Sequence, residues 1–280
     1  MLFQLLDKPN LAYALMLGPS FFLVYFRPKQ TLHRVGTVEI FIFMKKETAD
    51  AILQDVKTTY ANIAEEFDAS RKDLWEGFDD FLRFVKEGDK ILDAGCGNGR
   101  LVRLFEGKNI VYIGCDNNLE FIKIAKKNHP DNNFVFGDLM KMSFQDESFD
   151  DIFCIAALHH IPGKVYRQQA VQEIHRVLKG GGILILTNWD RYTIDFFLKL
   201  MKATVLKLIG ASKFDFKDVY IPWRNKAQRY YHCFTLNEMK KLIENNGFEI
   251  VDSYRAKQPL GCPASRNTTR GNLVVVAKKR

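Results

Sequence analysis

The segment that decides the fold is Lys90-Ile91-Leu92-Asp93-Ala94-Gly95-Cys96-Gly97-Asn98-Gly99. Its first four residues predict a buried β-strand, and the glycines predict a tight turn directly after it. Glycine has no Cβ atom, so such a turn can bend sharply and a ligand can approach its backbone closely. The segment therefore predicts a strand, a ligand-binding turn and then a helix.

On either side of this segment, predicted strands and helices alternate with short connections. Strands are expected at 90–93, 110–115, 134–136, 149–156, 183–187, 248–254 and 272–277. Helices are expected at 74–85, 99–105, 119–128, 165–178, 196–209 and 236–245, and apolar residues from Ile52 to Phe67 recur at helical spacing. The alternation indicates right-handed βαβ units. The predicted fold class is α/β: a Rossmann-like, mostly parallel seven-stranded sheet with helices on both faces.

Acidic residues at three predicted strand ends indicate which ligand binds. Asp93 stands two places before the first glycine, Asp116 ends the second strand and Asp138 follows the third. The spacing is G-x-G-x-G, not the G-x-G-x-x-G of dinucleotide-binding proteins, whose pyrophosphate a carboxylate would repel. S-adenosylmethionine instead carries ammonium and sulfonium charges, which a carboxylate attracts. We therefore expect an S-adenosylmethionine site and the fold of a class I methyltransferase.

Within this site, Asp93 is expected to act on the amino acid end, Asp116 on the ribose hydroxyls and Asp138 on the adenine amino group. The expected cofactor-binding residues are Asp93, Gly95, Cys96, Gly97, Asn98, Gly99, Asp116, Asn117, Asp138, Leu139 and Ile155. The plainer alternative is that the aspartates only cap helices or turns. Their shared placement at strand ends, beside one glycine turn, favours the binding role.

The basic charge is concentrated in the last third of the chain. Residues 191–280 hold 18 Lys and Arg against 7 Asp and Glu, and the whole chain has a net charge of +8. This asymmetry indicates either a polyanionic partner such as RNA or a solvated basic face. The five cysteines include no C-x-x-C pair, so neither a zinc site nor a disulfide framework is expected, and no metal site is expected. A reducing, cytoplasmic location follows from this cysteine usage.

Residues 1–43 are expected to be an N-terminal extension to a methyltransferase domain at 44–280, which contains an inserted aromatic and basic segment at 191–234. The apolar run from Leu11 to Phe26 is short for a membrane span, and no positive cluster precedes it as in a signal peptide. The extension reflects either a misassigned start upstream of Met44 or a weak membrane-associating segment. Apart from that segment, no stable membrane association is expected.

Several motifs outside the glycine turn are more specific. They are Tyr60-x-x-Ile63-Ala64-x-x-Phe67, Ser70-Arg71-x-x-x-Trp75, Gly114-Cys115-Asp116, Ile155-Ala156-Ala157-Leu158-His159-His160, Glu173-Ile174-His175-Arg176-Val177-Leu178, Arg229-Tyr230-Tyr231-His232 and Gly271-Asn272. Together they resemble the tRNA wobble-uridine carboxyl methyltransferases, which include the methyltransferase domain fused to the AlkB-type tRNA hydroxylase. The resemblance covers residues 56–280 in patches. One departure is Leu273, because the family usually has Trp after the terminal Gly-Asn.

The resemblance implies methyl transfer to the carboxylate of a 5-carboxymethyl-type wobble uridine in tRNA. A carboxylate is ionised at neutral pH, so alignment and desolvation would supply most of the acceleration, without a strong general base. His159 and His160 are expected to shape the acceptor pocket, and Arg71 to pair with the carboxylate. The alternatives are a histidine that caps a turn and an arginine on a solvated helix face.

The expected substrate- or RNA-binding residues are Tyr60, Trp75, Arg224, Arg229, Tyr231, His232, Arg270 and Asn272. Aromatic residues interleaved with basic ones are typical of surfaces that stack bases and contact phosphates. The same segment also fits a lid over the cofactor cleft, and Tyr60 and Trp75 fit a helix core. The resemblance further implies tRNA as a partner, together with a small activator subunit.

Two other classes of protein stay open. One is a methyltransferase for a lipid, quinone or metabolite acid, in which the apolar helix at 196–209 and the N-terminal run would form a hydrophobic entrance. The other is a non-catalytic subunit that binds S-adenosylmethionine, which the intact glycine turn disfavours. A basic surface around the cleft would favour RNA, whereas a closed apolar pocket would favour a small molecule.

Overall fold

The computed structural model describes residues 2–5, 11–17, 20–26, 44–71, 74, 77–190, 194–208, 211–224, 226–256 and 271–280; within 2–26 and 194–198 it describes the backbone alone. Strands β1 (Leu2–Leu5), β2 (Leu11–Leu17) and β3 (Ser20–Phe26) form an antiparallel sheet in that order. Among the described residues, no helix is long and apolar enough to cross a membrane. The proposed division after residue 43 lies outside the described residues and stays a prediction.

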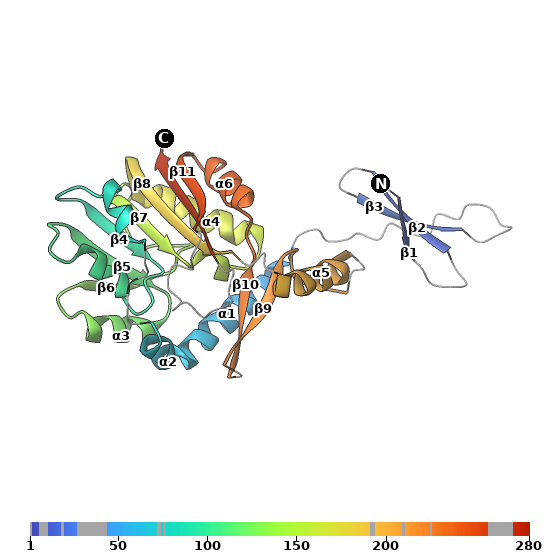
Figure 1. Ribbon diagram of the computed structural model, residues 1–280, viewed down its shortest axis with the longest axis horizontal. Helices are drawn as coiled ribbons and strands as arrows, with labels where there is room; N and C mark the ends of the chain where they lie inside the picture. Colours follow the sequence, from blue (N-terminus) through green and yellow to red (C-terminus); the bar gives the residue numbers. More distant parts are fainter. Residues whose placement is uncertain are drawn as a thin grey trace.

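The main sheet has seven strands in the order β11-β12-β8-β7-β4-β5-β6 (Figure 1). Its strands are β4 (Lys90–Ala94), β5 (Val111–Asp116), β6 (Asn133–Phe136), β7 (Phe149–Ile155), β8 (Leu178–Trp189), β11 (Phe248–Ala256) and β12 (Asn272–Lys279). β4 to β8 pair in parallel, whereas β12 is antiparallel to β8 and to β11. The predicted mostly parallel, seven-stranded sheet is confirmed.

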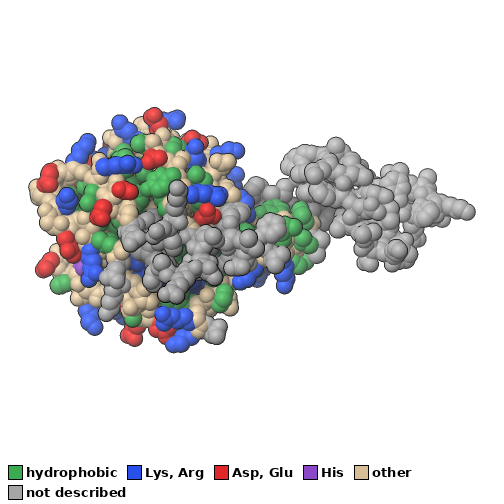
Figure 2. Space-filling model, in the orientation of Figure 1, with side chains coloured by type: hydrophobic (Ala, Val, Ile, Leu, Met, Phe, Trp, Pro, Cys, Tyr) green, Lys and Arg blue, Asp and Glu red, His purple; other side chains and the backbone are tan. Residues whose placement is uncertain are grey.

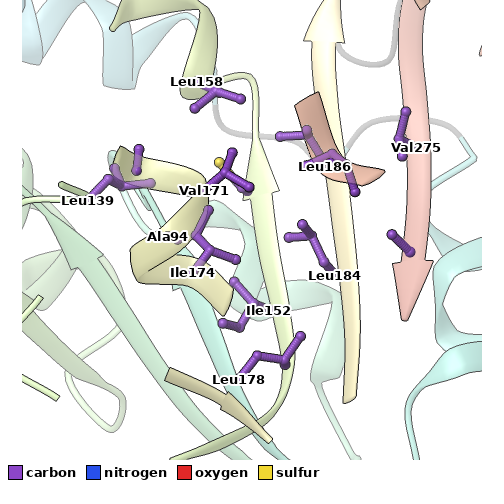
Figure 3. Packing of buried hydrophobic residues seen from close by; sticks show 14 of the residues in the cluster. Ala94, Leu139, Ile152, Leu158, Val171, Ile174, Leu178, Leu184, Leu186 and Val275 are labelled. Carbon is purple, nitrogen blue, oxygen red and sulfur yellow. The ribbon is translucent and has the colours of Figure 1, made fainter. Parts of the chain in front are cut away.

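Apolar side chains leave the strands alternately toward the two faces, as strand geometry requires. On β4, Leu92 and Ala94 join one buried cluster, and Ile91 joins the other. The first cluster packs the sheet against α4 (Lys164–Val177) and α6 (Leu236–Glu244), with Val171 and Ile174 of α4 facing the strands (Figure 3). The second packs against η1 (Asp79–Phe84), η2 (Arg100–Phe105) and α3 (Leu119–Asn128). Helices therefore cover both faces.

Three predicted elements differ in length or type. The helix expected at 74–85 is in its described part only the 3-10 helix η1, because Gly77 takes a left-handed conformation with φ +84. The helix expected at 99–105 is the 3-10 helix η2. Strand β8 begins at Leu178 and not at Ile183, so the glycines at 180–182 lie inside the strand. A Cβ atom at Gly182 would lie 2.5 Å from the carbonyl oxygen of Asp150, which explains why glycine stands there.

The inserted segment folds over the carboxyl side of the sheet. Helix α5 (Ile194–Leu208) confirms the helix expected there, and β9 (Asp218–Trp223) pairs antiparallel with β10 (Ala227–His232) in a hairpin that the sequence analysis did not predict. Leu200 of α5 packs with Val219 and Ile221 of the hairpin. Helix α1 (Lys46–Asn62) contacts β10, and α2 (Ala64–Ala69) follows it (Figure 1). The hairpin and α1 thus close over the strand ends.

Candidate functional site

A cleft lies at the carboxyl ends of β4, β5 and β7, between these strands, α1 and the β9–β10 hairpin. Ligands bind at this edge of open α/β sheets because the strand-to-helix turns meet there. The residues that line the cleft include Lys57, Tyr60, Phe67, Arg71, Asp93, Gly95, Cys96, Gly97, Asn98, Arg100, Asp116, Asn117, Phe121, Asp138, Leu139, Ile155, Ala157, His160, Trp189, Arg229 and Tyr231. Carboxyl groups gather on the strand-end side of this lining, together with Arg100 near Asp93, and aromatic side chains with Arg229 gather on the other side.

The glycine turn has a separate reason for each of its glycines, although all three have positive φ angles of +84, +53 and +79. A Cβ atom at Gly95 would lie 2.5 Å from the Cβ atom of Ala157, and one at Gly99 would lie 2.7 Å from the ring of Phe134. At Gly97, by contrast, a Cβ atom would meet no protein atom within 4 Å. Gly95 and Gly99 therefore allow close packing, whereas Gly97 presents bare backbone to open space beside the cleft.

The Asp116 carboxylate holds the turn and the next helix together. Its Oδ2 accepts a hydrogen bond of 2.9 Å from the Gly97 amide, and its Oδ1 accepts one of 2.9 Å from the Asn118 amide. Burial raises the pKa of Asp116 to about 6, and the two amides act in the opposite direction. Further positive charge would stabilise this carboxylate in its ionised form.

Asp93 is more deeply buried, with 2% of its surface exposed. It accepts a hydrogen bond of 2.7 Å from the Tyr112 hydroxyl. Burial raises the pKa of Asp93 to about 7; the Tyr112 hydroxyl lowers it, and the neighbouring Asp116 carboxylate raises it. Two adjacent carboxyl groups with raised pKa values form a site in which a bound cation is strongly favoured.

These features fit S-adenosylmethionine, which combines cationic groups with a nucleoside. The open backbone at Gly97 leaves room for a ligand, and the carboxylates match its positive charges. Of the eleven residues predicted to bind the cofactor, ten line the cleft; Gly99 does not, because it packs against Phe134. Asn98 also has a supporting function, since its side chain donates to Asp68 Oδ1 at 2.9 Å and to the Arg71 carbonyl at 3.1 Å. The individual contacts to the cofactor stay predictions.

The aromatic half of the cleft centres on His160. Its Nδ1 lies 3.0 Å from the Tyr230 carbonyl oxygen, which can only accept, so Nδ1 carries the proton. In the neutral ring Nε2 therefore accepts from the Tyr60 hydroxyl, 2.9 Å away. Burial raises the pKa of Tyr60, as does the neighbouring Tyr231, whereas the charge of Arg229 lowers it. His160 is thus held as a hydrogen-bonded wall of the pocket.

His159 lies behind this wall and does not line the cleft. Its side chain is 2% exposed, and both its amide and its Nδ1 point to Asn188 Oδ1, at 3.1 and 2.8 Å. The ring stacks on Tyr231 with a centroid distance of 4.8 Å. His159 therefore supports the pocket from the core, and of the two histidines only His160 can reach a ligand there.

Other residues predicted to bind substrate are more buried than an RNA surface requires. His232 is 3% exposed, and its Nδ1 and Nε2 lie 2.8 Å from Asp218 and 2.7 Å from Glu238. Asn272 is 2% exposed at the start of β12, opposite Trp189. Both contribute to packing and not to an open surface. Arg224 is exposed at the hairpin tip, with its guanidinium 5.8 Å from the Trp223 ring.

Trp75 and Arg270 lie outside the described residues. Several lining residues were not predicted from the sequence, among them Lys57, Arg100 and Trp189. Trp189 could have been found, because it ends the strand expected at 183–187 on the same edge of the sheet as the aspartates. For Lys57 and Arg100 the sequence carries no signal beyond helical position.

Comparisons with known proteins agree with this fold and site. The sequence family described as "Methyltransferase domain" matches residues 92–186, which hold the glycine turn, the three aspartates and His160. Among solved structures, a SAM-dependent methyltransferase from Methanosarcina mazei has a TM-score of 0.62 at 23% identity and covers 74% of this chain and 98% of its own. Residues 92–186 therefore match a methyltransferase domain, and the chain has the fold of the class I S-adenosylmethionine-dependent methyltransferases.

More particular relatives carry tRNA-related names. The tRNA (carboxymethyluridine(34)-5-O)-methyltransferase of Schizosaccharomyces pombe is 29% identical over 220 residues, which cover 70% of this chain and 90% of the relative. The Arabidopsis thaliana protein of the same name is 33% identical over 144 residues, but these cover 51% of this chain and only 35% of the relative. A chain of the complex between the Haloferax volcanii Trm112 methyltransferase activator and a methyltransferase has a TM-score of 0.56 at 19% identity and covers 80% of this chain and 96% of its own.

Proposed function

We propose that this enzyme methylates the carboxylate of a 5-carboxymethyl-type wobble uridine in tRNA. The observation that carries the proposal is the division of one cleft into two halves. Carboxylates at the strand ends suit the cationic cofactor, and Arg71 and Arg229, which line the same cleft, suit an anionic acceptor. The relatives named as carboxymethyluridine methyltransferases support the same substrate class.

The chemistry requires little from the side chains beyond placement. When bound, S-adenosylmethionine supplies a methyl group on a sulfonium, which is an activated donor. The acceptor carboxylate is ionised at neutral pH, so no residue has to remove a proton. The arginines would bind and orient the carboxylate, while Tyr60, Trp189 and Tyr231 exclude water from the line between donor and acceptor.

The test is transfer of labelled methyl from S-adenosylmethionine to total RNA, in parallel with a lipid and small-molecule extract. We expect label in tRNA that mild base releases, because a methyl ester hydrolyses readily. Base-stable label in tRNA would keep the RNA substrate and discard the ester. Label only in the small-molecule extract would overturn the tRNA proposal.

A small-molecule acid is the second candidate, and one observation favours it. Tyr231 and His232, expected to bind substrate or RNA, are at most 3% exposed. In Figure 2, Lys and Arg side chains on the visible face are mixed with Asp and Glu and form no single basic patch. The small-molecule arm of the same assay decides between the two candidates.

A small activator subunit and a cytoplasmic location belong to the same proposal. The support is indirect, since the Haloferax volcanii complex describes that methyltransferase and not this one. Expression of the tagged chain in its own cell type, followed by mass spectrometry of stoichiometric partners, tests the subunit. A monomeric chain that is fully active on tRNA would remove the activator from the proposal.

A further inference from the structure

In the described part of the chain two arginines near the cleft are buried, Arg167 and Arg229, and only Arg167 has an acidic partner there. Arg167 is 4% exposed, lies 4.0 Å from the Asp215 carboxylate and donates to the Ile161 carbonyl at 3.3 Å. Arg229 is 5% exposed and forms no ion pair with any described residue. Its Nε and Nη1 are buried without a hydrogen-bond acceptor in the described part of the chain. An unpaired buried charge is costly, so its presence indicates a ligand.

Aromatic rings surround Arg229, and its Nε and Nη1 find no acceptor among them, although the guanidinium also interacts with the Tyr60 hydroxyl. The guanidinium carbon lies 4.6 Å from the Trp223 ring centroid, 5.2 Å from that of Tyr231 and 5.7 Å from that of Trp189. Ring faces attract the positive charge but accept no in-plane pair of hydrogen bonds. The rings therefore hold the guanidinium in position, and the adjacent Nε and Nη1 donors stay available for an anion.

The position of Arg229 suits an acceptor and not the cofactor. It stands on β10 next to Tyr230, whose carbonyl oxygen holds His160, and it lines the same cleft as His160 and Tyr60. Asp93 and Asp116 line the strand-end side of that cleft. An anion bound at Arg229 would thus face the acidic cofactor half across the cleft.

Arg71, the arginine that the sequence analysis assigned to the acceptor carboxylate, is placed less well. It is only partly buried, and its Nη1 already donates to the Ser70 carbonyl at 3.1 Å. Its guanidinium lies 5.8 Å from the Trp223 ring, the same ring that Arg229 approaches more closely. Arg71 therefore also lines the cleft, but it is less buried than Arg229 and one of its donors is already used by a backbone carbonyl.

We propose that Arg229, held between Trp189, Trp223 and Tyr231, is the residue that binds the carboxylate of the methyl acceptor. The inference rests on the proposed function, because it names the group that recognises that acceptor. It makes Arg229 a specificity-determining residue: an acid is accepted, and a neutral amide of the same shape is rejected because it leaves the guanidinium without an anion.

The experiment measures binding of two nucleosides, 5-carboxymethyluridine and its amide 5-carbamoylmethyluridine, to the full chain saturated with S-adenosylhomocysteine. We expect the wild type to bind the acid at least about tenfold more tightly than the amide. Arg229→Gln should bind both equally, and Arg229→Lys should keep a reduced preference, because it retains charge but not the planar donors. The control Arg103→Gln, at an exposed arginine on η2 that does not line the cleft, should discriminate as the wild type does.

A wild type that binds acid and amide equally would overturn the inference, as would an Arg229→Gln variant that keeps the full preference. If Arg229→Gln does not fold, Arg229→Lys decides: an undiminished preference contradicts the assignment. A different result would overturn the proposed function: no transfer of methyl by the wild type to tRNA that carries the acid. In that case the acid-against-amide comparison still reports on Arg229 itself, since it needs no turnover.

Discussion

The two halves of the cleft differ in how they are built. The acidic half comes from residues 93–99, 116 and 138, each directly at the end of a strand, and it is held by local amide hydrogen bonds such as that from Gly97 to Asp116. The aromatic and cationic half is assembled from α1, η3 (Leu158–His160) and the β9–β10 hairpin, which are far apart in the sequence. The proposal assigns the cofactor to the first half and the methyl acceptor to the second.

The largest expected effect is a difference in the free energy of unfolding between variants of two buried arginines, the structural Arg167 and the ligand-binding Arg229. Arg167→Gln should lower the free energy of unfolding by about 3 kcal/mol, because it leaves the buried Asp215 carboxylate without its cation. Arg229→Gln should change it by less than about 1 kcal/mol, since an unpaired charge is removed along with its ring contacts. Urea denaturation of both variants measures the difference. Equal losses would mean that Arg229 is a structural residue too.

In the acidic half, Asp116→Ala should weaken binding of S-adenosylmethionine about thirtyfold, or about 2 kcal/mol. The change removes a carboxylate and leaves the Gly97 and Asn118 amides without their acceptor. Titration calorimetry gives the affinity, and the exposed Asp131→Asn serves as control. An affinity within twofold of the wild type would exclude Asp116 from the cofactor site.

The pH dependence of cofactor binding should reveal the raised pKa values of Asp93, about 7, and Asp116, about 6. A bound cation favours ionised carboxylates, so affinity should rise about tenfold from pH 5.5 to 7.5, about one pKa unit of coupling.

In the ligand-free protein, these two carboxyl groups have higher pKa values in the folded state than in the unfolded state. The free energy of unfolding should therefore fall as pH rises from about 4 to 7.

Calorimetry at a series of pH values measures the binding part, and Asp93→Asn should flatten it. A steep pH dependence that persists in Asp93→Asn would assign the titration to another group. Thermal melts of the ligand-free protein at the same pH values test whether its stability falls as pH rises.

The smallest expected effect concerns the second half. Tyr60→Phe removes the hydroxyl that donates to His160 Nε2 at 2.9 Å, a hydrogen bond worth about 1 kcal/mol. We expect a loss of about fivefold in kcat/KM for the acceptor with unchanged cofactor affinity. Steady-state kinetics with each substrate varied separates the two. If the variant changed only the KM for the cofactor, Tyr60 would belong to the cofactor half of the cleft and not to the acceptor half.

The same contrast explains what the sequence could reveal. The sheet, the glycine turn and the strand-end aspartates follow from local patterns, because hydrophobic period and turn residues are set within a few positions. The β9–β10 hairpin was missed because polar residues such as Gln228 and Arg229 interrupt the alternation of apolar residues in β10. No local sequence signal distinguishes a buried arginine from an exposed one. The surroundings of Arg229 include the rings of Trp189, which is distant in the sequence, and of Trp223, so its proposed role could be inferred only from the structure.

Burial also accounts for the residues whose placement differs from the expectation. The aromatic and basic motif at 229–232 was interpreted as an RNA surface with a lid as the alternative, and its side chains are at most 5% exposed. A hairpin that must cover strand ends and α1 needs large side chains inside, and tyrosine and histidine supply them. Composition alone cannot tell that use from base stacking.

The most direct test uses a synthetic anticodon stem-loop with either 5-carboxymethyluridine or uridine at the wobble position. The purified chain, with S-adenosylmethionine and any stoichiometric partner found with it, is incubated with each, and nucleosides are analysed by mass spectrometry. The account predicts one added methyl group, labile to base, on the acid-bearing loop alone. Methylation of the uridine loop to the same extent, or of neither loop while the cofactor is bound, would contradict it.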